Sequence, residues 1–205
     1  MSLTVHPFFD SSDNAYAFVV ANPESGCCAI VDPLVGVDAH GADCTHCADL
    51  ILDWVKAQRY VVRWILQTHA PRRPGAVPYL KKNLLCAQTV AAAGTSDDAS
   101  FDRLVSDGDT LCLGHACGRV VAVPGCLQGS VSYHFEDLAF VGDFAWGPAR
   151  NSVLALPDDT RLFVCHYNAL EGHRSRFVTT VLDEKQRGTG AAAEQMRDER
   201  AQLTL

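Results

Sequence analysis

The sequence predicts an α/β protein in which two β-sheets pack together and helices cover their outer faces. Two observations predict this class. Apolar strand patterns and helical patterns occur in two successive blocks along the 205 residues. The composition, 48% hydrophobic, provides enough apolar side chains for one sizeable core. No linker or simple repeat divides the chain, so we expect one domain over residues 1–187 and a tail over 188–205, rich in Ala, Glu and Arg.

The first block begins with strands and ends in a helix. A turn at Asn22–Gly26 between two strand patterns indicates a hairpin, and Asp32 and Pro33 end its second strand. A loop over Leu34–Ala42 then precedes a helix over Cys44–Arg59, which Asp43 is expected to cap. The expected strands of this block are Val5–Phe9, Tyr16–Ala21 and Cys27–Val31.

The centre of the pattern is the apolar strand Val61–Leu66 and the histidine beyond it, His69. A run of β-branched, aromatic and aliphatic residues is typical of a strand covered on both faces. A histidine at the carboxyl end of such a strand lies where open α/β sheets bind their ligands. The alternative is a histidine that only packs or caps there. Asp32, at the end of an earlier strand, either points back toward a strand-end site or accepts hydrogen bonds from its turn.

The remaining elements are short and separated by turns. We expect helices over Gly75–Lys82 and Phe177–Gln186, a polar loop over Ala91–Ser100, and a hairpin turn at Glu136-Asp137. The expected strands are Leu84–Ala87, Leu111–Leu113, Arg119–Val123, Ser130–Phe135, Leu138–Val141 and Arg161–Val164.

Charge and composition exclude several classes of partner. The net charge of −7 and the pI of about 5.5 argue against nucleic acid and against an anionic membrane. No apolar run approaches the roughly 20 residues of a membrane span. Residues 1–10 lack the pattern of a signal peptide, so we expect a cytoplasmic protein. Nine cysteines in that compartment should be mostly reduced thiols, and an odd number cannot all pair internally.

Four polar side chains follow apolar strand patterns directly: His69, Cys126, Asp143 and His166. Imidazole, thiolate and carboxylate are the usual protein ligands of zinc and iron. Together the four residues therefore predict a metal site at the edge where these strands end.

The chain resembles the metallo-β-lactamase superfamily over about residues 3–187, and its persulfide dioxygenase and glyoxalase II-like branch most of all. The motifs that carry the resemblance are Thr68-His69, Asp107–Leu111, Pro124-Gly125-Cys126, Gly129–Tyr133, Val141-Gly142-Asp143, and Leu156-Pro157 leading to Cys165-His166. The resemblance implies a four-layer α/β/β/α sandwich with the site along one edge of the two sheets. It also implies a homodimer.

The metal-binding motif departs from the family pattern. The family carries His-x-His-x-Asp-His after the central strand, whereas this chain keeps His69 alone and continues with Ala70 and Pro71. The family's Pro-Gly-His is Pro124-Gly125-Cys126 here. The resemblance therefore implies at most one divalent metal, iron or zinc, held by His69, Cys126 and Asp143. A thiolate donor shifts the preference toward zinc. A second metal is not expected.

Three arginines are candidates for binding an anionic ligand. Arg72 and Arg73 could occupy the space of the missing second metal, pair with Asp143 and bind a carboxylate or thiolate. The alternative is a solvated basic turn. Arg150, after Gly147-Pro148, lies near the place where the family has the arginine of a Gly-Arg-Thr-Asp segment, so the resemblance makes it a candidate for binding a substrate carboxylate.

Two cysteine pairs have alternative interpretations. Cys44 and Cys47 form a Cys-x-x-Cys at a helix start, where a depressed thiol pKa would permit redox chemistry. Cys112 and Cys117 flank a turn and could bind metal or react. The alternative for both pairs is that they are buried or incidental thiols.

Two functions follow from these observations. The first is an enzyme with one metal ion, persulfide dioxygenase-like or hydrolase-like, that acts on a glutathione-type thiol or thioester. The second is a pseudoenzyme that keeps the fold but binds a small anionic ligand or a protein partner without turnover.

Overall fold

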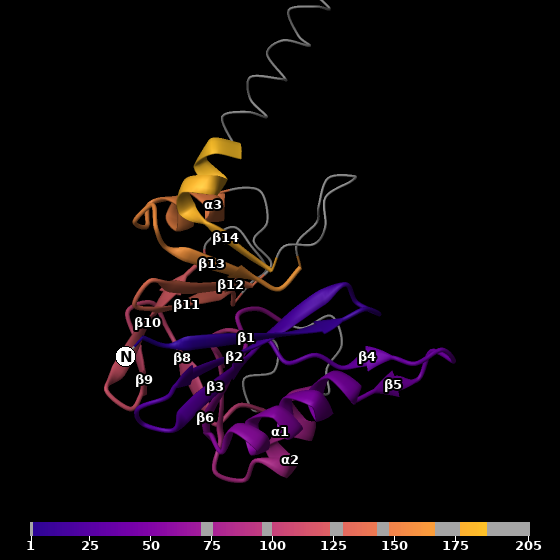
Figure 1. Cartoon of the computed structure of the whole chain (residues 1–205). Coiled ribbons are helices and arrows are strands. Elements are labelled where there is room, and N and C mark those ends of the chain that lie inside the picture. The colour runs from indigo at the N-terminus through magenta and orange to yellow at the C-terminus, as the bar shows by residue number, and fades with distance from the viewer. Residues whose placement is uncertain are drawn as a thin grey trace, which may run out of the picture.

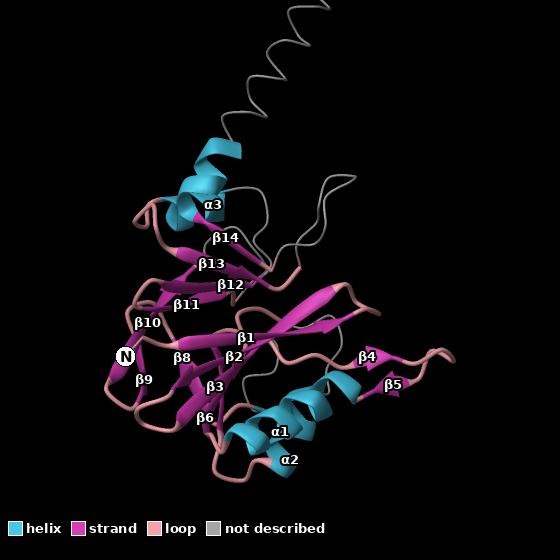
Figure 2. Cartoon of the chain, viewed as in Figure 1, coloured by secondary structure: helices cyan, strands magenta, loops and turns pink. Residues whose placement is uncertain are grey.

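A computed structural model describes residues 2–70, 76–95, 100–123, 129–142, 148–166 and 177–187. Two six-stranded sheets lie face to face, and helices lie on their outer sides (Figures 1 and 2). The predicted layering of helices, two sheets and helices is thereby confirmed. No helix in the described segments is long and apolar enough to cross a membrane.

The first sheet combines an antiparallel hairpin with parallel strands. Its order is β1-β2-β3-β6-β7-β8, with β3, β6, β7 and β8 parallel. The strands are β1 (Thr4–Asp10), β2 (Ala15–Asn22), β3 (Cys27–Val31), β6 (Val61–Leu66), β7 (Gln88–Ala92) and β8 (Arg103–Val105). Helices α1 (His46–Gln58) and α2 (Ala76–Asn83) cover the outer face, where Ile51 and Leu80 pack on Ile30 and Ile65.

The second sheet has the order β14-β13-β12-β11-β10-β9. Its strands are β9 (Thr110–Leu113), β10 (Ala116–Ala122), β11 (Val131–Phe135), β12 (Leu138–Gly142), β13 (Arg161–Val164) and β14 (Val178–Thr180). The strands β12 and β13 are parallel, so their carboxyl ends lie at the same edge. Helix α3 (Pro148–Leu154) and a last helix over 181–187 cover the outer face, where Val153 and Val181 join Val141 and Leu162 in one apolar cluster.

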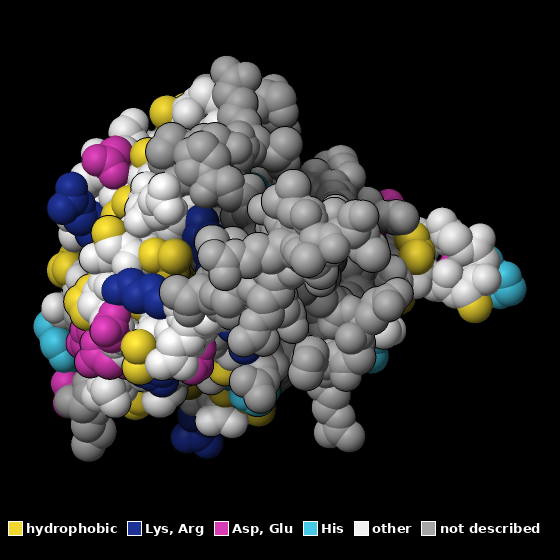
Figure 3. All heavy atoms as spheres, turned by 90° about the horizontal axis from the view of Figure 1, so that it is seen from above, with side chains coloured by type: hydrophobic (Ala, Val, Ile, Leu, Met, Phe, Trp, Pro, Cys, Tyr) yellow, Lys and Arg dark blue, Asp and Glu magenta, His cyan; other side chains and the backbone are white. Residues whose placement is uncertain are grey.

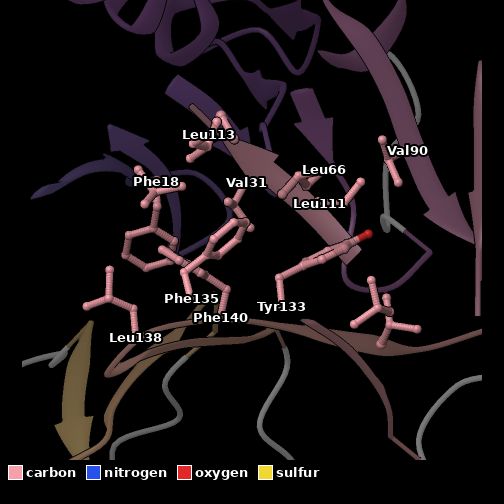
Figure 4. Packing of buried hydrophobic residues seen from close by; sticks show 14 of the residues in the cluster. Phe18, Val31, Leu66, Val90, Leu111, Leu113, Tyr133, Phe135, Leu138 and Phe140 are labelled. Carbon is pink, nitrogen blue, oxygen red and sulfur yellow. The ribbon is translucent and has the colours of Figure 1, made fainter. Parts of the chain in front are cut away.

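The main core fills the space between the two sheets. Phe18 and Leu66 from the first sheet meet Tyr133, Phe135 and Phe140 from the second, as Figure 4 shows. Each of these side chains is at most 1% exposed. Burial of large aromatic and aliphatic side chains on both inner faces fixes how the sheets sit against each other.

Hydrogen bonds also join the two sheets near the edge where β6 and β13 end. The Val131 amide donates to the Thr68 carbonyl over 2.8 Å, and the Tyr16 amide donates to the Cys165 carbonyl over 2.9 Å. The buried Tyr133 hydroxyl donates to the Gln67 carbonyl over 2.9 Å. The segment after β6 and the segment after β13 are therefore held at fixed positions relative to each other.

A small hairpin of β4 (Gly36–Val37) and β5 (Asp43–Cys44) projects beside α1 (Figure 1). The prediction of a plain loop over Leu34–Ala42 was wrong, because this segment pairs with the residues before the helix. The predicted cap at Asp43 was also wrong, since Asp43 belongs to β5. The helix begins at His46, after Thr45, whose hydroxyl donates to the Asp49 carboxylate over 2.9 Å.

The surface seen from above carries charges of both signs. Among the coloured residues of Figure 3, Lys and Arg side chains are interspersed with Asp and Glu side chains. The described part of this face is therefore electrostatically mixed.

Three other elements differ from their prediction. The strand expected over Leu84–Ala87 is β7, a few residues later, and it extends into the expected loop. The short strand β8 and helix α3 were not predicted. Elements of three to seven residues carry too few periods of a hydrophobic pattern to be recognised.

The closing segment is a strand followed by a helix, and the prediction of one helix over Phe177–Gln186 was wrong at its beginning. The β-branched residues of β14 pair with β13, which overrides the helical pattern. The Thr180 hydroxyl then accepts from the Asp183 amide over 3.1 Å and caps the helix over 181–187.

Cys112 and Cys117 form a disulfide, which corrects their interpretation as incidental thiols. The two residues lie directly opposite each other on β9 and β10. Thiols remain at Cys27, Cys28, Cys44, Cys47, Cys86 and Cys165 among the described cysteines.

Candidate metal centre

The candidate site lies at the edge where β6 and β13 end. His69 follows β6 by three residues, and Cys165 and His166 follow β13 directly. One ring nitrogen from each histidine and the Cys165 sulfur all lie within 4.8 Å of one another. The two imidazole rings meet edge to face, with centroids 6.2 Å apart. Parallel strand ends from two facing sheets thus converge on three metal-binding side chains.

Burial differs across the three side chains. Cys165 is 1% exposed and His69 is 9% exposed, whereas His166 is half-buried. The cluster therefore has a closed side at Cys165 and a more open side at His166. An ion bound here would be partly shielded from water, which strengthens its interaction with ligand atoms.

A hydrogen-bonded chain from Asp32 fixes His69. The Asp32 carboxylate accepts from the Thr68 amide over 2.8 Å and from the Thr68 hydroxyl over 2.7 Å. The same hydroxyl oxygen lies 2.7 Å from His69 Nδ1. The single hydroxyl proton is directed at Asp32, so His69 Nδ1–H is the donor in the second contact. In that tautomer the Nε2 atom carries the lone pair, which is the form of imidazole that binds a metal ion.

Gly142 packs against Thr68 and His69, the last two residues of this hydrogen-bonded series. Its φ of +60° is in the left-handed region. A Cβ built there would overlap the Thr68 hydroxyl and lie 2.9 Å from His69 Nδ1. The Gly142 carbonyl also accepts from the Cys165 amide over 2.9 Å. One glycine at the end of β12 therefore permits the close approach of all three segments.

Two of the four predicted metal ligands, His69 and His166, are brought together. The other two, Cys126 and Asp143, lie outside the described residues, as do Arg72 and Arg73. Cys165 was not predicted as a ligand, because a cysteine that ends an apolar strand resembles a small core residue. In the sequence, the one indication that Cys165 could be a ligand is that it directly precedes His166.

Among the described residues, Arg150 contacts the last helix. Its guanidinium donates to the Glu184 carbonyl over 2.6 Å and lies 3.9 Å from the Glu184 carboxylate. The buried Glu184 also accepts from Thr179 and Arg187. These contacts hold the last helix against α3, and they give Arg150 a structural role.

Cys44 and Cys47 do not have the environment of a reactive pair. Cys47 is buried, and burial together with the charge of Asp10 raises the pKa of its thiol to about 12. The direction is opposite to the depression that redox chemistry at a helix start requires. Cys44 lies on β5 and is half-buried.

Known proteins resemble this chain over most of its length. It is 32% identical over 218 aligned residues to the beta-lactamase hydrolase-like protein of Xylella fastidiosa. The alignment covers 88% of this chain and 51% of that protein. It is 30% identical to a probable metallo-hydrolase of Burkholderia pseudomallei, over 89% of this chain and 78% of that one. The chain belongs to the metallo-β-lactamase superfamily.

Within the superfamily, the chain is related to glyoxalase II-type enzymes. It is 29% identical to a hydroxyacylglutathione hydrolase of Erythrobacter litoralis, over 80% of this chain and 67% of that enzyme. The chain spans about half the length of the beta-lactamase hydrolase-like proteins that it matches. No protein-family model matches the sequence.

Solved structures confirm the metallo-β-lactamase fold. ETHE1 from Myxococcus xanthus superposes with a TM-score of 0.72 at 21% identity, over 90% of this chain and 82% of that one. A metallo-β-lactamase from Staphylococcus aureus gives a TM-score of 0.74 at 15% identity, over 91% of this chain and 62% of that one.

The donor set fits the metal ions that this superfamily binds. Around a tetrahedral zinc ion, nitrogen and sulfur ligand atoms lie about 3.3–3.7 Å from one another. The candidate atoms lie within 4.8 Å, so side-chain movements of about an ångström would close the site. Two imidazoles and a thiol match zinc in donor type, and the imidazoles also match iron.

Proposed function

We propose that this chain binds one divalent metal ion, zinc or iron, at the strand-end edge and has a reduced or altered activity on a small thiol or thioester of the glutathione type. The observation that carries the proposal is the convergence of His69, Cys165 and His166 within 4.8 Å. The relationship to hydroxyacylglutathione hydrolases and to ETHE1 supports the substrate class.

The roles of the chain's own residues follow from their contacts. His69 and His166 would hold the ion, and Asp32 and Thr68 orient the His69 ring and fix its tautomer. A bound divalent ion supplies Lewis acidity and lowers the pKa of a bound water. The half-buried His166 side leaves room for a ligand to approach.

A single metal is proposed because of the residues after His69. The sequence continues Ala70-Pro71-Arg72-Arg73, and this run contains no further histidine or carboxylate. A second divalent ion needs several such donors. Arg72, Arg73 and Arg150 remain the candidates for binding the anionic part of a ligand. Among the described residues, Arg150 also binds Glu184.

The same observation favours a second candidate function. Without a second metal, the chain could bind a small anionic ligand or a protein partner and catalyse no reaction. A homodimer and a cytoplasmic location remain predictions under either function.

Two assays on protein purified without added metal test the proposal. We expect about one zinc or iron ion per chain by elemental analysis. Hydrolysis of S-lactoylglutathione should stay well below about 1 per second, the lower end of ordinary enzymatic rates. Oxygen consumption with glutathione persulfide separates dioxygenase from hydrolase chemistry. Two bound ions with ordinary thioesterase turnover would contradict the single-metal proposal, and one ion with neither activity would favour the pseudoenzyme.

A further inference from the structure

We infer that Cys165 supplies a thiolate ligand to the metal, so that the site is a Cys/His₂ centre that selects zinc over iron. This inference rests on the proposed single-metal site and adds the donor that decides which ion the site prefers. Three observations carry it: the direction of the Cys165 side chain, the backbone that holds it, and the chemistry of sulfur.

The side chain of Cys165 points between the sheets. Along β13, Phe163 packs in the core between the sheets, whereas Leu162 and Val164 pack on the outer face. Side chains alternate along a strand, so Cys165 follows Phe163 toward the space between the sheets. The Cys165 sulfur lies within 4.8 Å of one ring nitrogen of His69 and one of His166.

The backbone of Cys165 is fixed on both sides. Its amide donates to the Gly142 carbonyl over 2.9 Å, and its carbonyl accepts from the Tyr16 amide over 2.9 Å. Gly142 in turn packs against Thr68 and His69. The sulfur is therefore positioned by the same contacts that position the first imidazole, as a preorganised ligand requires.

The chemistry of the sulfur donor determines which metal ion the site prefers. A thiolate is a soft donor that suits zinc, whereas mononuclear oxygen-activating iron sites use two histidines and a carboxylate. A buried thiol loses its proton when a metal binds, and the positive ion compensates the buried negative charge. Cys165 is 1% exposed, so this compensation would be strong.

Cobalt substitution tests the inference directly. The metal-free protein is titrated with Co²⁺, and the near-ultraviolet absorption from sulfur-to-cobalt charge transfer is followed. We expect the band to reach its full height at one equivalent of Co²⁺. It should be absent in Cys165→Ser and unchanged in Cys86→Ser, a matched control at an exposed thiol. In competition experiments, Cys165→Ser should lose part of the preference for Zn²⁺ over Fe²⁺, because the soft sulfur donor is replaced by a hard oxygen.

Three other results of the Co²⁺ titration would each contradict either the metal site or the thiolate ligand. If one Co²⁺ binds without the charge-transfer band, the proposed metal site stands and the thiolate ligand is wrong. If the band survives Cys165→Ser but disappears in Cys126→Ser, the sulfur comes from Cys126 and the inference is wrong. If no Co²⁺ binds, both the proposed site and this inference fail.

A second measurement covers the case in which Cys165→Ser does not fold. Zinc-edge X-ray absorption of Cys126→Ser, with Cys165 intact, should show one sulfur at about 2.3 Å and at least two nitrogens at about 2.0–2.1 Å. Zinc bound with nitrogen and oxygen scatterers alone would overturn the inference.

Discussion

At the scale of single residues, Thr68 links the Asp32 carboxylate to the His69 ring. Thr68→Val removes the hydroxyl that links Asp32 to His69, while it keeps the side-chain shape. We expect metal affinity to fall by about 10–100-fold, the usual effect of losing an outer-shell partner. Thr68→Ser keeps the hydroxyl and should bind nearly as well. Equal metal affinity in Thr68→Val, measured by chelator competition, would show that the chain from Asp32 does not orient His69.

Gly142 offers a second test at this scale. Gly142→Ala places a methyl group against Thr68 and His69 at a φ of +60°. Gly26→Ala is the matched control, because its φ is +67° and nothing lies within 4 Å of the added Cβ. The control substitution should lower the free energy of unfolding by about 1–2 kcal/mol, because alanine is strained in the left-handed backbone conformation. Gly142→Ala should lower the free energy of unfolding further, because the overlap with Thr68 and His69 adds to the backbone strain. Similar unfolding free energies in urea would mean that the site tolerates the methyl group.

At the scale of elements, strand β11 carries a pH-dependent contribution to stability. Burial, and secondarily the positive charge of Arg119, lowers the pKa of His134 to about 4. Its ring lies 2.8 Å from the Ser132 hydroxyl. Between pH 4 and the unperturbed value of 6.5, the unfolded chain binds more protons at this residue than the folded protein. The free energy of unfolding should therefore decrease as the pH falls through this window.

His134→Gln isolates that contribution. The variant cannot titrate, so its unfolding free energy should depend less on pH between about 6.5 and 4. A dependence as steep as that of the parent would assign the effect to other groups. His6 is one such group, because burial lowers its pKa in the same direction.

The elements also show where sequence patterns succeed. Residues 27–31 and 161–164 were predicted with their observed bounds, because β-branched or aromatic apolar runs end there at clear turns. The strand β14 was mistaken for helix, because its pairing with β13 is tertiary information. His69 and His166 could be predicted as site residues from their place at strand ends. Cys165 could not be assigned as a ligand, because only the facing of the two sheets puts its sulfur beside His69.

At the scale of the whole molecule, the domain should be complete at Arg187. Val181 is fully buried in the outer cluster of the second sheet, and Glu184 binds Arg150 and Thr179. A chain that ends at Arg187 should keep the cooperative unfolding transition of the full chain. A chain that ends at Thr180 loses the helix over 181–187 and should be destabilised, because it exposes the apolar cluster that Val181 covers. An insoluble or unfolded 1–187 chain would show that the tail is part of the domain.

The metal site that we propose for this metallo-β-lactamase-fold chain holds one ion between the ends of β6 and β13. An anomalous difference map at the zinc edge, from crystals of protein purified with zinc, tests it most directly. We expect one peak, within about 2.0–2.3 Å of ligand atoms from His69, Cys165 and His166. Two peaks about 3.5–4 Å apart would show a two-metal clamp, and a map without a peak at this edge would show that the three side chains do not form a metal site.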